Sequence, residues 1–336
     1  MQGENQPRKS RTRVDHGKLG QIGTIVAYGL REQNQGYVFR TPCIPAKKAG
    51  QKHSAKVYFK LENYQLSGSY AFRGAMARMS FQSPEFPLIT ASSGNHGIAA
   101  ALASHALGRD LTIVMPKTVE PYKLEKVKAY AVKIILYGSD LNEARECAER
   151  LGSSGKYKYF SPYNDSLVIA GYGTVWIEIY QQCKDVKNIF VPMGGGALIS
   201  GIGCVIEEVK PKPRVWGISA VNSMAMAASL ATGFMVETEH LPTLAESVAG
   251  DVTRNSLAFA LAGLVVDDIV TCNEDEIRAA LKQLAFEEGM HVEGSAALAL
   301  AGFNKVAHKV WGQRSAIVLT GANFDWETLG NVIYDD

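Results

Sequence analysis

The chain has 336 residues, of which 46% are hydrophobic and 20% are charged, and its formal net charge is +2. This length and composition are typical of a globular protein with two packed lobes. The near balance of charge excludes a general electrostatic attraction to nucleic acid or membrane, and no apolar run reaches the ~18 residues of a membrane span.

The N-terminal segment 1–20 is polar and carries the one basic cluster, at 7–13. We expect a flexible lead rather than a nucleic-acid-binding arm, and the segment lacks the apolar core of a signal peptide. The sequence contains no HExxH pair, and its cysteines show neither close pairing nor metal-ligand spacing, at positions 43, 147, 183, 204 and 272. This pattern predicts a cytoplasmic protein without a disulfide framework or a zinc site.

Short β-branched apolar runs alternate with longer amphipathic stretches along most of the chain. Strands are predicted at 56–61, 86–91, 111–116, 133–138, 188–193, 214–220 and 315–321, and helices at 97–108, 140–152 and 273–289. Asn273 is expected to cap the last of these helices, and Gly289 to end it. The alternation predicts an α/β fold with mostly parallel sheets, which bind ligands beyond the carboxyl ends of their strands.

Three successive glycines, Gly194–Gly196, separate a predicted strand from a helix. Such a loop directs several backbone N–H groups and the positive end of a helix dipole at one point, which favours a phosphate. The dinucleotide-binding pattern GxGxxG is not met, because Ile199 replaces its third glycine, and the GK[ST] ending of a P-loop is absent. A tight turn without any ligand is the alternative interpretation.

Two further turns follow predicted strands. Ser92–His96 places hydroxyl and amide groups at the start of a helix, an arrangement that suits a carboxylate, although the same residues also cap helices without a ligand. Thr320 provides a hydroxyl at the tip of the last strand and predicts little by itself.

Together, "ENYQLSGSYAFRGA", "SSGNHG", "GGGAL" and "LTGAN", in this order, resemble the fold type II family of pyridoxal-phosphate (PLP) enzymes, above all the serine/threonine dehydratases and serine racemases. The resemblance extends from about Phe39 to the C-terminus. It implies a two-lobed fold of the tryptophan synthase β type, PLP as cofactor, an amino acid as substrate and a homodimer. It also implies a large cofactor-binding domain, 21–85 with 161–336, and a small domain, 86–160.

The resemblance assigns roles residue by residue. Members of the family read GSFK.RGA where this chain reads "GSYAFRGA", so Ala71 stands in the place of the lysine that holds the cofactor covalently. Tyr70 would lie beside the cofactor ring, Asn95 would bind its 3' oxygen, and Thr320 would face its pyridine nitrogen. The phosphate would lie on Gly194, Gly195, Gly196, Ala197 and Leu198, and the substrate carboxylate on Ser92, Ser93, Gly94, Asn95 and His96.

Other matched positions narrow the implied chemistry. A neutral hydroxyl at Thr320 makes the cofactor ring a weaker electron sink, which favours elimination over transamination. Ser93 stands where racemases carry a serine that protonates Cα. Ser219 and Ala225 replace two acids that bind a divalent metal in some relatives, so no metal site is expected. The chain also ends too early for a C-terminal regulatory domain.

A methyl group at residue 71 can neither hold the cofactor nor accept the Cα proton. Because "SGSY" and "FRGA" fix the register, we interpret Ala71 as a lysine-to-alanine replacement that stalls an active lyase, since the other site loops are intact. The predicted activity is dehydration and deamination of a β-hydroxy amino acid, such as serine, threonine or 3-hydroxyaspartate, to a ketoacid and ammonia. A racemase, a β-replacement synthase and a natural non-catalytic PLP-binding protein are the alternatives.

Overall fold

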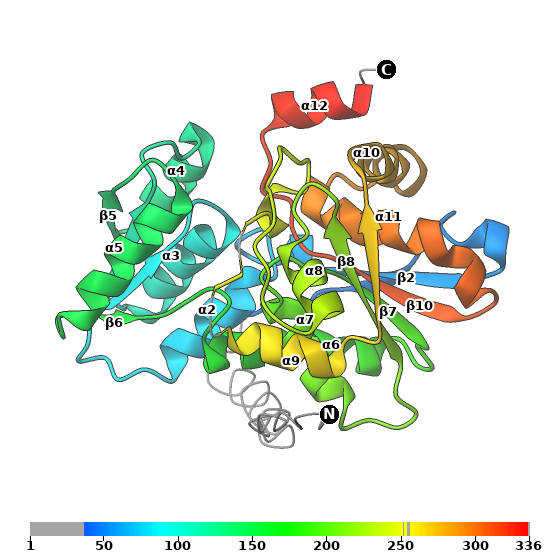
Figure 1. Cartoon of the computed structure of the whole chain (residues 1–336), viewed down its shortest axis with the longest axis horizontal. Helices are drawn as coiled ribbons and strands as arrows, with labels where there is room; N and C mark the ends of the chain where they lie inside the picture. The colour runs from blue at the N-terminus through cyan, green and yellow to red at the C-terminus, as the bar shows by residue number, and fades with distance from the viewer. Residues whose placement is uncertain (1–36, 251, 254–255, 335–336) are drawn as a thin grey trace, which may run out of the picture.

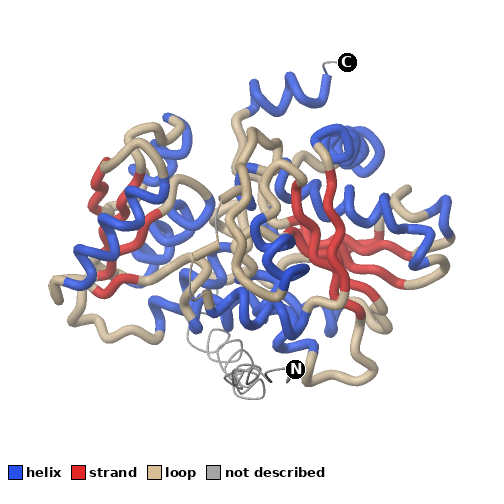
Figure 2. The backbone as a smooth tube through the Cα atoms, in the orientation of Figure 1, coloured by secondary structure: helices blue, strands red, loops and turns tan. Residues whose placement is uncertain are grey.

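The structure is a computed structural model that describes residues 37–250, 252–253 and 256–334, so the predicted lead 1–20 lies outside the described residues. Two parallel-stranded lobes lie side by side, and each is a sheet flanked by helices (Figures 1 and 2). No helix in the described ranges is long and apolar enough to cross a membrane.

The larger sheet has six strands in the order β1-β2-β10-β7-β8-β9. β1 pairs antiparallel with β2, and every other neighbouring pair is parallel. The bounds are β1 Cys43–Pro45, β2 Lys56–Leu61, β7 Asn188–Pro192, β8 Arg214–Ala220, β9 Asp268–Cys272 and β10 Arg314–Leu319. The last strand of the chain therefore lies in the middle of the sheet.

The smaller sheet has four parallel strands in the order β5-β4-β3-β6. Its strands are β3 Leu88–Ala91, β4 Leu111–Met115, β5 Lys133–Leu136 and β6 Lys158–Tyr159. The segment 86–160 thus forms this sheet, whereas the division of the chain into two domains stays a prediction.

The helices cover both sheets (Figure 1). They are α2 Ala71–Ser80, α3 Asn95–Leu107, α4 Pro121–Lys128, α5 Leu141–Ser153, α6 Ser166–Gln182, α7 Ala197–Ile206, α8 Ala225–Thr232, α9 Leu257–Val265, α10 Glu274–Gln283, α11 Gly294–Val306 and α12 Trp326–Tyr334. Asn273 caps α10 in a capping box with Glu276, as predicted. A π-helical turn continues α10 to Gly289, whose φ of 73° ends it.

All seven predicted strands are present, and two of them, 56–61 and 214–220, have the predicted bounds. Three short strands were missed: β1, β6 and β9. No helix was predicted between 67 and 80, whereas the structure has α2, which begins at Ala71. Its first residues carry no capping side chain or periodic apolar pattern, so tertiary packing rather than a local signal sets the start of this helix.

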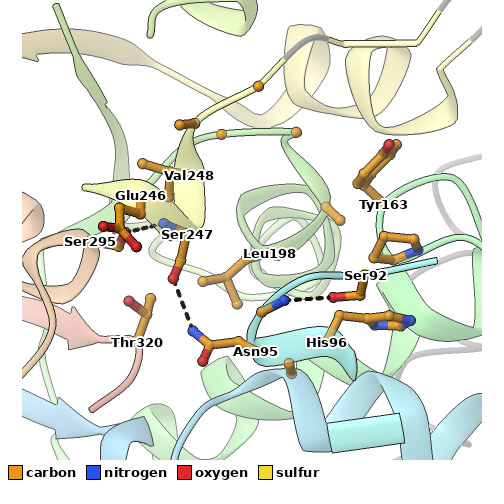
Figure 3. A pocket seen from close by; sticks show the side chains of 18 of the residues that line it. Ser92, Asn95, His96, Tyr163, Leu198, Glu246, Ser247, Val248, Ser295 and Thr320 are labelled. Atoms are coloured by element: carbon orange, nitrogen blue, oxygen red, sulfur yellow. Dashed lines mark hydrogen bonds between the residues drawn. The ribbon is translucent and has the colours of Figure 1, made fainter. Parts of the chain in front are cut away.

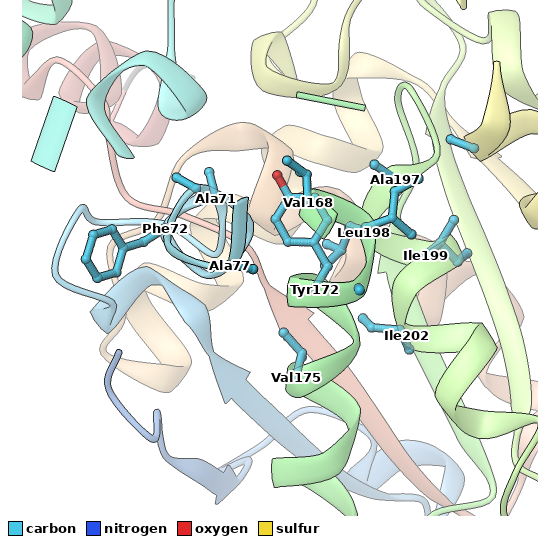
Figure 4. Close-up of a cluster of buried hydrophobic side chains, with 14 of the residues drawn as sticks. Ala71, Phe72, Ala77, Val168, Tyr172, Val175, Ala197, Leu198, Ile199 and Ile202 are labelled. Carbon is cyan, nitrogen blue, oxygen red and sulfur yellow. The ribbon is translucent and has the colours of Figure 1, made fainter. Parts of the chain in front are cut away.

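The core beneath the junction of the lobes is built from α2, α6 and α7 (Figure 4). Every residue of α7 is buried, so this helix is apolar on all sides. Gly201 lets α7 approach α6, since a Cβ at this position would collide with the carbonyl oxygen of Ile169. Ala71 in α2 and Leu198 in α7 belong to these packed helices, and Figure 4 shows them on facing elements.

A cluster of charged side chains connects α2 to α6 and to the segment that follows β2. The Arg73 guanidinium donates to both carboxylate oxygens of Glu62, at 2.7 and 2.8 Å, and to both of Glu178, at 2.7 and 2.8 Å. Lys60 donates to Glu178 at 2.6 Å. Burial opposes ionisation of Glu178, but Arg73 and Lys60 outweigh it and lower the pKa of this carboxyl. Two cations thus balance two buried carboxylates two residues beyond Ala71.

Candidate functional site

One cavity, of about 290 Å³, lies between the two sheets and collects the predicted site residues. Three parallel strands, β3, β7 and β10, end immediately before segments that line it. The predicted residues among its lining are Tyr70, Ala71, Ser92, Ser93, Gly94, Asn95, His96, Gly194, Gly195, Gly196, Ala197, Leu198 and Thr320. The family resemblance and the position of these segments at strand ends had both predicted that they share one site.

The glycine loop connects β7 to α7. Gly196 has a φ of 83°, which only glycine adopts readily, and a Cβ on Gly194 would collide with the backbone of Val248. The first N–H groups of α7 have no acceptor within the helix. The loop is therefore a close-fitting cradle of backbone donors at the positive end of a helix, suited to a phosphate.

Thr320 provides a buried hydroxyl on the opposite wall. Its carbonyl oxygen accepts from the Tyr70 N–H at 3.0 Å, which fixes the backbone, but its Oγ1 has no hydrogen-bond partner among the described residues. A buried hydroxyl without a partner is costly unless a ligand satisfies it. The orphaned Oγ1 fits a small molecule with a polar ring atom in the cavity.

Some polar groups of the turn at the start of α3 make hydrogen bonds within the turn, and others are available to a ligand in the cavity. The Ser92 hydroxyl accepts from the Gly94 N–H at 3.1 Å and from the Gly97 N–H at 2.9 Å, so it caps the turn (Figure 3). The Ser93 hydroxyl has no hydrogen bond with any described residue. The amides of the first turn of α3 have no acceptor within the helix and are available to an anion.

His96 is buried on this turn and contacts the Thr90 hydroxyl through Nε2 at 3.1 Å. Burial lowers its pKa to about 3. Below the ordinary pKa of 6.5, the unfolded chain gains a proton at this site that the folded protein does not. We therefore expect the free energy of unfolding to fall by up to about 1.4 kcal/mol per pH unit from pH 6.5 toward pH 3. Denaturant titrations at several pH values measure this free energy. In His96→Gln it should depend less steeply on pH in this range, and an unchanged pH dependence contradicts the assignment.

Asn95 lies at the centre of a polar network across the cavity. Its Nδ2 donates to the Ser247 hydroxyl at 3.2 Å (Figure 3). The same Nδ2 donates to Glu293 at 2.8 Å, and the Asn95 Oδ1 accepts from Asn323 at 2.7 Å. Burial raises the pKa of Glu293, against the hydrogen bonds from its neighbours. The Asn95 amide is thus fully bonded, and a ligand oxygen could take the donor that now contacts Ser247.

Sequence reasoning assigned no role to Glu293, Glu246, Ser247 or Lys123, which also line the cavity. Lys123 pairs with Glu120 at 2.7 Å and Glu246 at 3.0 Å, and these hydrogen bonds outweigh burial to raise its pKa. It is the one side-chain amine on the described cavity wall. The raised pKa favours the ammonium form of Lys123.

Comparison of the chain with known proteins shows its family and its fold. Residues 35–321 match the family "Pyridoxal-phosphate dependent enzyme". An L-threonine ammonia-lyase of Thermotoga maritima is 35% identical over 304 residues, which are 88% of this chain and 74% of that protein.

Two solved structures have the same fold. The processed form of threonine deaminase isoform 2 from Solanum lycopersicum has a TM-score of 0.87 and 31% identity, covering 96% of this chain and 89% of that one. Maize serine racemase has a TM-score of 0.86 and 26% identity, covering 94% and 96%. The fold is thus that of the fold type II PLP enzymes, and the chain belongs to the family of pyridoxal-phosphate dependent enzymes.

Proposed function

We propose that the cavity binds PLP together with a β-hydroxy amino acid, and that it is the active site of an ammonia-lyase in which Ala71 replaces the amine of the reaction. The observation that carries this proposal is the meeting of a glycine cradle, an orphaned hydroxyl and a helix start in one cavity. A phosphate, a ring nitrogen and a carboxylate are the three groups that these features suit.

Some residues of the cavity would hold the cofactor, and others would orient the substrate. Gly194–Leu198 would hold the phosphate, Thr320 the ring nitrogen of the cofactor, and Asn95 an oxygen on that ring. Tyr70 would lie beside the cofactor ring, and its own ring packs edge-on against Tyr172, with the two ring centroids 4.8 Å apart. When bound, PLP supplies an electron sink for the negative charge that develops at Cα. The amides of the first turn of α3 would orient the substrate carboxylate.

Proton transfer is the step that this chain lacks. Ala71 is 3% exposed and presents only a methyl group to the cavity, so it cannot accept a proton from Cα. Burial lowers the pKa of His96 to about 3, so its imidazole is too weak a base to replace an amine. We therefore propose that the chain binds cofactor and amino acid but releases ketoacid slowly. Ketoacid formation by an Ala71→Lys variant, on a panel of hydroxy amino acids, tests the reaction.

Cofactor binding is testable in the chain itself. PLP should bind without covalent attachment, and Gly194→Val should weaken binding more than 10-fold, because the new side chain enters the space of the Val248 backbone. Equilibrium dialysis gives both affinities. Gly330→Ala is the matched control, since a Cβ there meets no atom within 4 Å. Equal affinity of the parent and Gly194→Val would mean that the phosphate lies elsewhere.

Racemisation is a second candidate, favoured by the Ser93 hydroxyl in the cavity, which has no hydrogen-bond partner among the described residues. A hydroxyl that makes no structural hydrogen bond is free to carry a proton to a substrate. In the Ala71→Lys background, Ser93→Ala should abolish D-amino acid formation and spare ketoacid formation. If D-serine formation persists in Ser93→Ala, this candidate is wrong. The homodimer implied by the resemblance stays a prediction.

A further inference from the structure

Two cysteines that lie far apart in the sequence meet at the edge of the large sheet. Cys43 begins β1, and Cys183 ends α6 as its C-cap residue. Their Sγ atoms lie 2.7 Å apart. This is closer than the ~3.5–4.0 Å at which non-bonded carbon atoms rest, although sulfur is the larger atom. The two side chains therefore point directly at each other.

The backbones that carry the two cysteines are held together independently of the sulfur atoms. The carbonyl oxygen of Thr41 accepts from Gln182 Nε2 at 3.0 Å and from Lys60 Nζ at 2.6 Å. Cys43 itself pairs with Lys60 in the β1–β2 ladder. Cys43 lies two residues after Thr41, and Cys183 directly follows Gln182. The two sulfur atoms therefore cannot move apart unless these hydrogen bonds break.

The two thiols differ in how easily they ionise. The hydrogen bond with Cys43 lowers the pKa of Cys183, burial opposes this effect, and the positive charges of Lys60 and Arg314 add to the lowering. The same hydrogen bond and burial raise the pKa of Cys43. Cys183 is therefore the sulfur that becomes a thiolate first, and the thiolate is the reactive form.

We propose that Cys43 and Cys183 are an oxidation site, at which a peroxide converts the two thiols into an intramolecular disulfide that ties β1 to the end of α6. The Cys183 thiolate attacks one peroxide oxygen, the O–O bond breaks, and the leaving hydroxide takes up a proton to become water. Cys43 sulfur then attacks the Cys183 sulfenic acid, the S–O bond breaks, and the leaving hydroxide takes the Cys43 proton. With hydrogen peroxide the sum is two thiols and one peroxide giving one disulfide and two waters.

The other three cysteines provide internal controls. They are buried, as Cys183 is, but each lies in a different element. Cys147 lies in α5, Cys204 in α7 and Cys272 in β9. Burial raises the pKa of Cys204 to about 11 and of Cys272 to about 12. None of the three has a sulfur contact with another described cysteine. Oxidation should therefore be confined to one pair.

The test treats the full chain, folded and at micromolar concentration, with a small excess of hydrogen peroxide. Thiol counting should fall from five to three per chain, and peptide mass spectrometry should find Cys43 linked to Cys183, two hydrogens lighter than the separate peptides. A thiol reductant should restore five thiols. Because the bridge closes a loop of about 140 residues, the oxidised protein should also unfold at a higher temperature than the reduced one.

Variants separate this site from general oxidation. Cys183→Ser should retain four thiols under the same treatment. Cys43→Ser should form no disulfide and should stop at a Cys183 sulfenic acid, which peptide mass spectrometry detects as one added oxygen. Cys272→Ser should still lose two thiols. Five unreacted thiols in the parent chain, a bridge between other cysteines or disulfide-linked pairs of chains would each overturn the proposal. The readouts need neither PLP nor turnover, so they are independent of the proposed function.

Discussion

Replacing Ala71 by lysine should raise the rate of ketoacid formation by about 10²–10⁴-fold, the range that a positioned acid–base group contributes. Residue 71 is the first residue of α2 and lines the cavity as well as the buried core, so a longer side chain at this position can reach the cavity. The amine would provide both a covalent attachment for PLP and a group that accepts the Cα proton. The measurement is ketoacid release from serine, threonine and 3-hydroxyaspartate with saturating PLP.

Ala71→Met is the matched control, because it adds a side chain of similar length without an amine. It should bind PLP no better than the parent chain and should form no more ketoacid. Borohydride reduction should fix PLP to residue 71 in the lysine variant alone. A folded Ala71→Lys protein that binds PLP but turns over no amino acid on the panel would contradict the lyase proposal and favour a non-catalytic PLP-binding protein.

Arg73→Met should lower the free energy of unfolding by about 3–5 kcal/mol, the usual loss when one partner of a buried ion pair is removed. The substitution keeps much of the side-chain volume but leaves Glu62 and Glu178 with Lys60 as their one nearby cation. Glu62 and Lys60 are fully buried, so water cannot take the place of the guanidinium. Guanidinium chloride titration of the parent and the variant measures the difference.

Arg214→Met is the control for this prediction. Arg214 pairs with Asp268 on an exposed edge of the sheet, and its side chain is 56% exposed. Exposed pairs contribute about 0–1 kcal/mol, so this variant should unfold close to the parent midpoint. Similar midpoints for Arg73→Met and Arg214→Met would show that the buried cluster does not stabilise the fold. Arg73→Lys should fall between the two variants, since it keeps the charge but loses the paired hydrogen bonds.

The strands were predictable because most are buried on both faces and read as continuous apolar runs. The bounds of 214–220 followed from such a run, whereas the strand predicted at 86–91 begins at Leu88, after Pro87, which has no N–H for the ladder. β1 was missed because its three residues are not fully buried and include Pro45. Short edge strands of this kind carry no periodic signal.

The site was predictable where consecutive residues of one loop suggest a ligand by themselves, as in the glycine loop and the Ser92 turn. Glu293 was not predictable in this way, because its role depends on Asn95 and Asn323, which come from other segments. The segments around Glu293 and Ser247 lie within the part of the chain that the family resemblance covers, but this extent does not say which side chain faces a cavity. The Cys43–Cys183 contact likewise depends on tertiary packing alone.

The position of β10 has a consequence for the order in which the protein folds during synthesis. β10 is the last strand to leave the ribosome, and it pairs with β2 on one side and β7 on the other. Until it inserts, the two parts of the sheet have unpaired edges, and Thr320 is missing from the cavity. The nascent chain therefore cannot complete the large sheet before β10 is made. We expect the cavity to be ready for a cofactor only after β10 has inserted between β2 and β7.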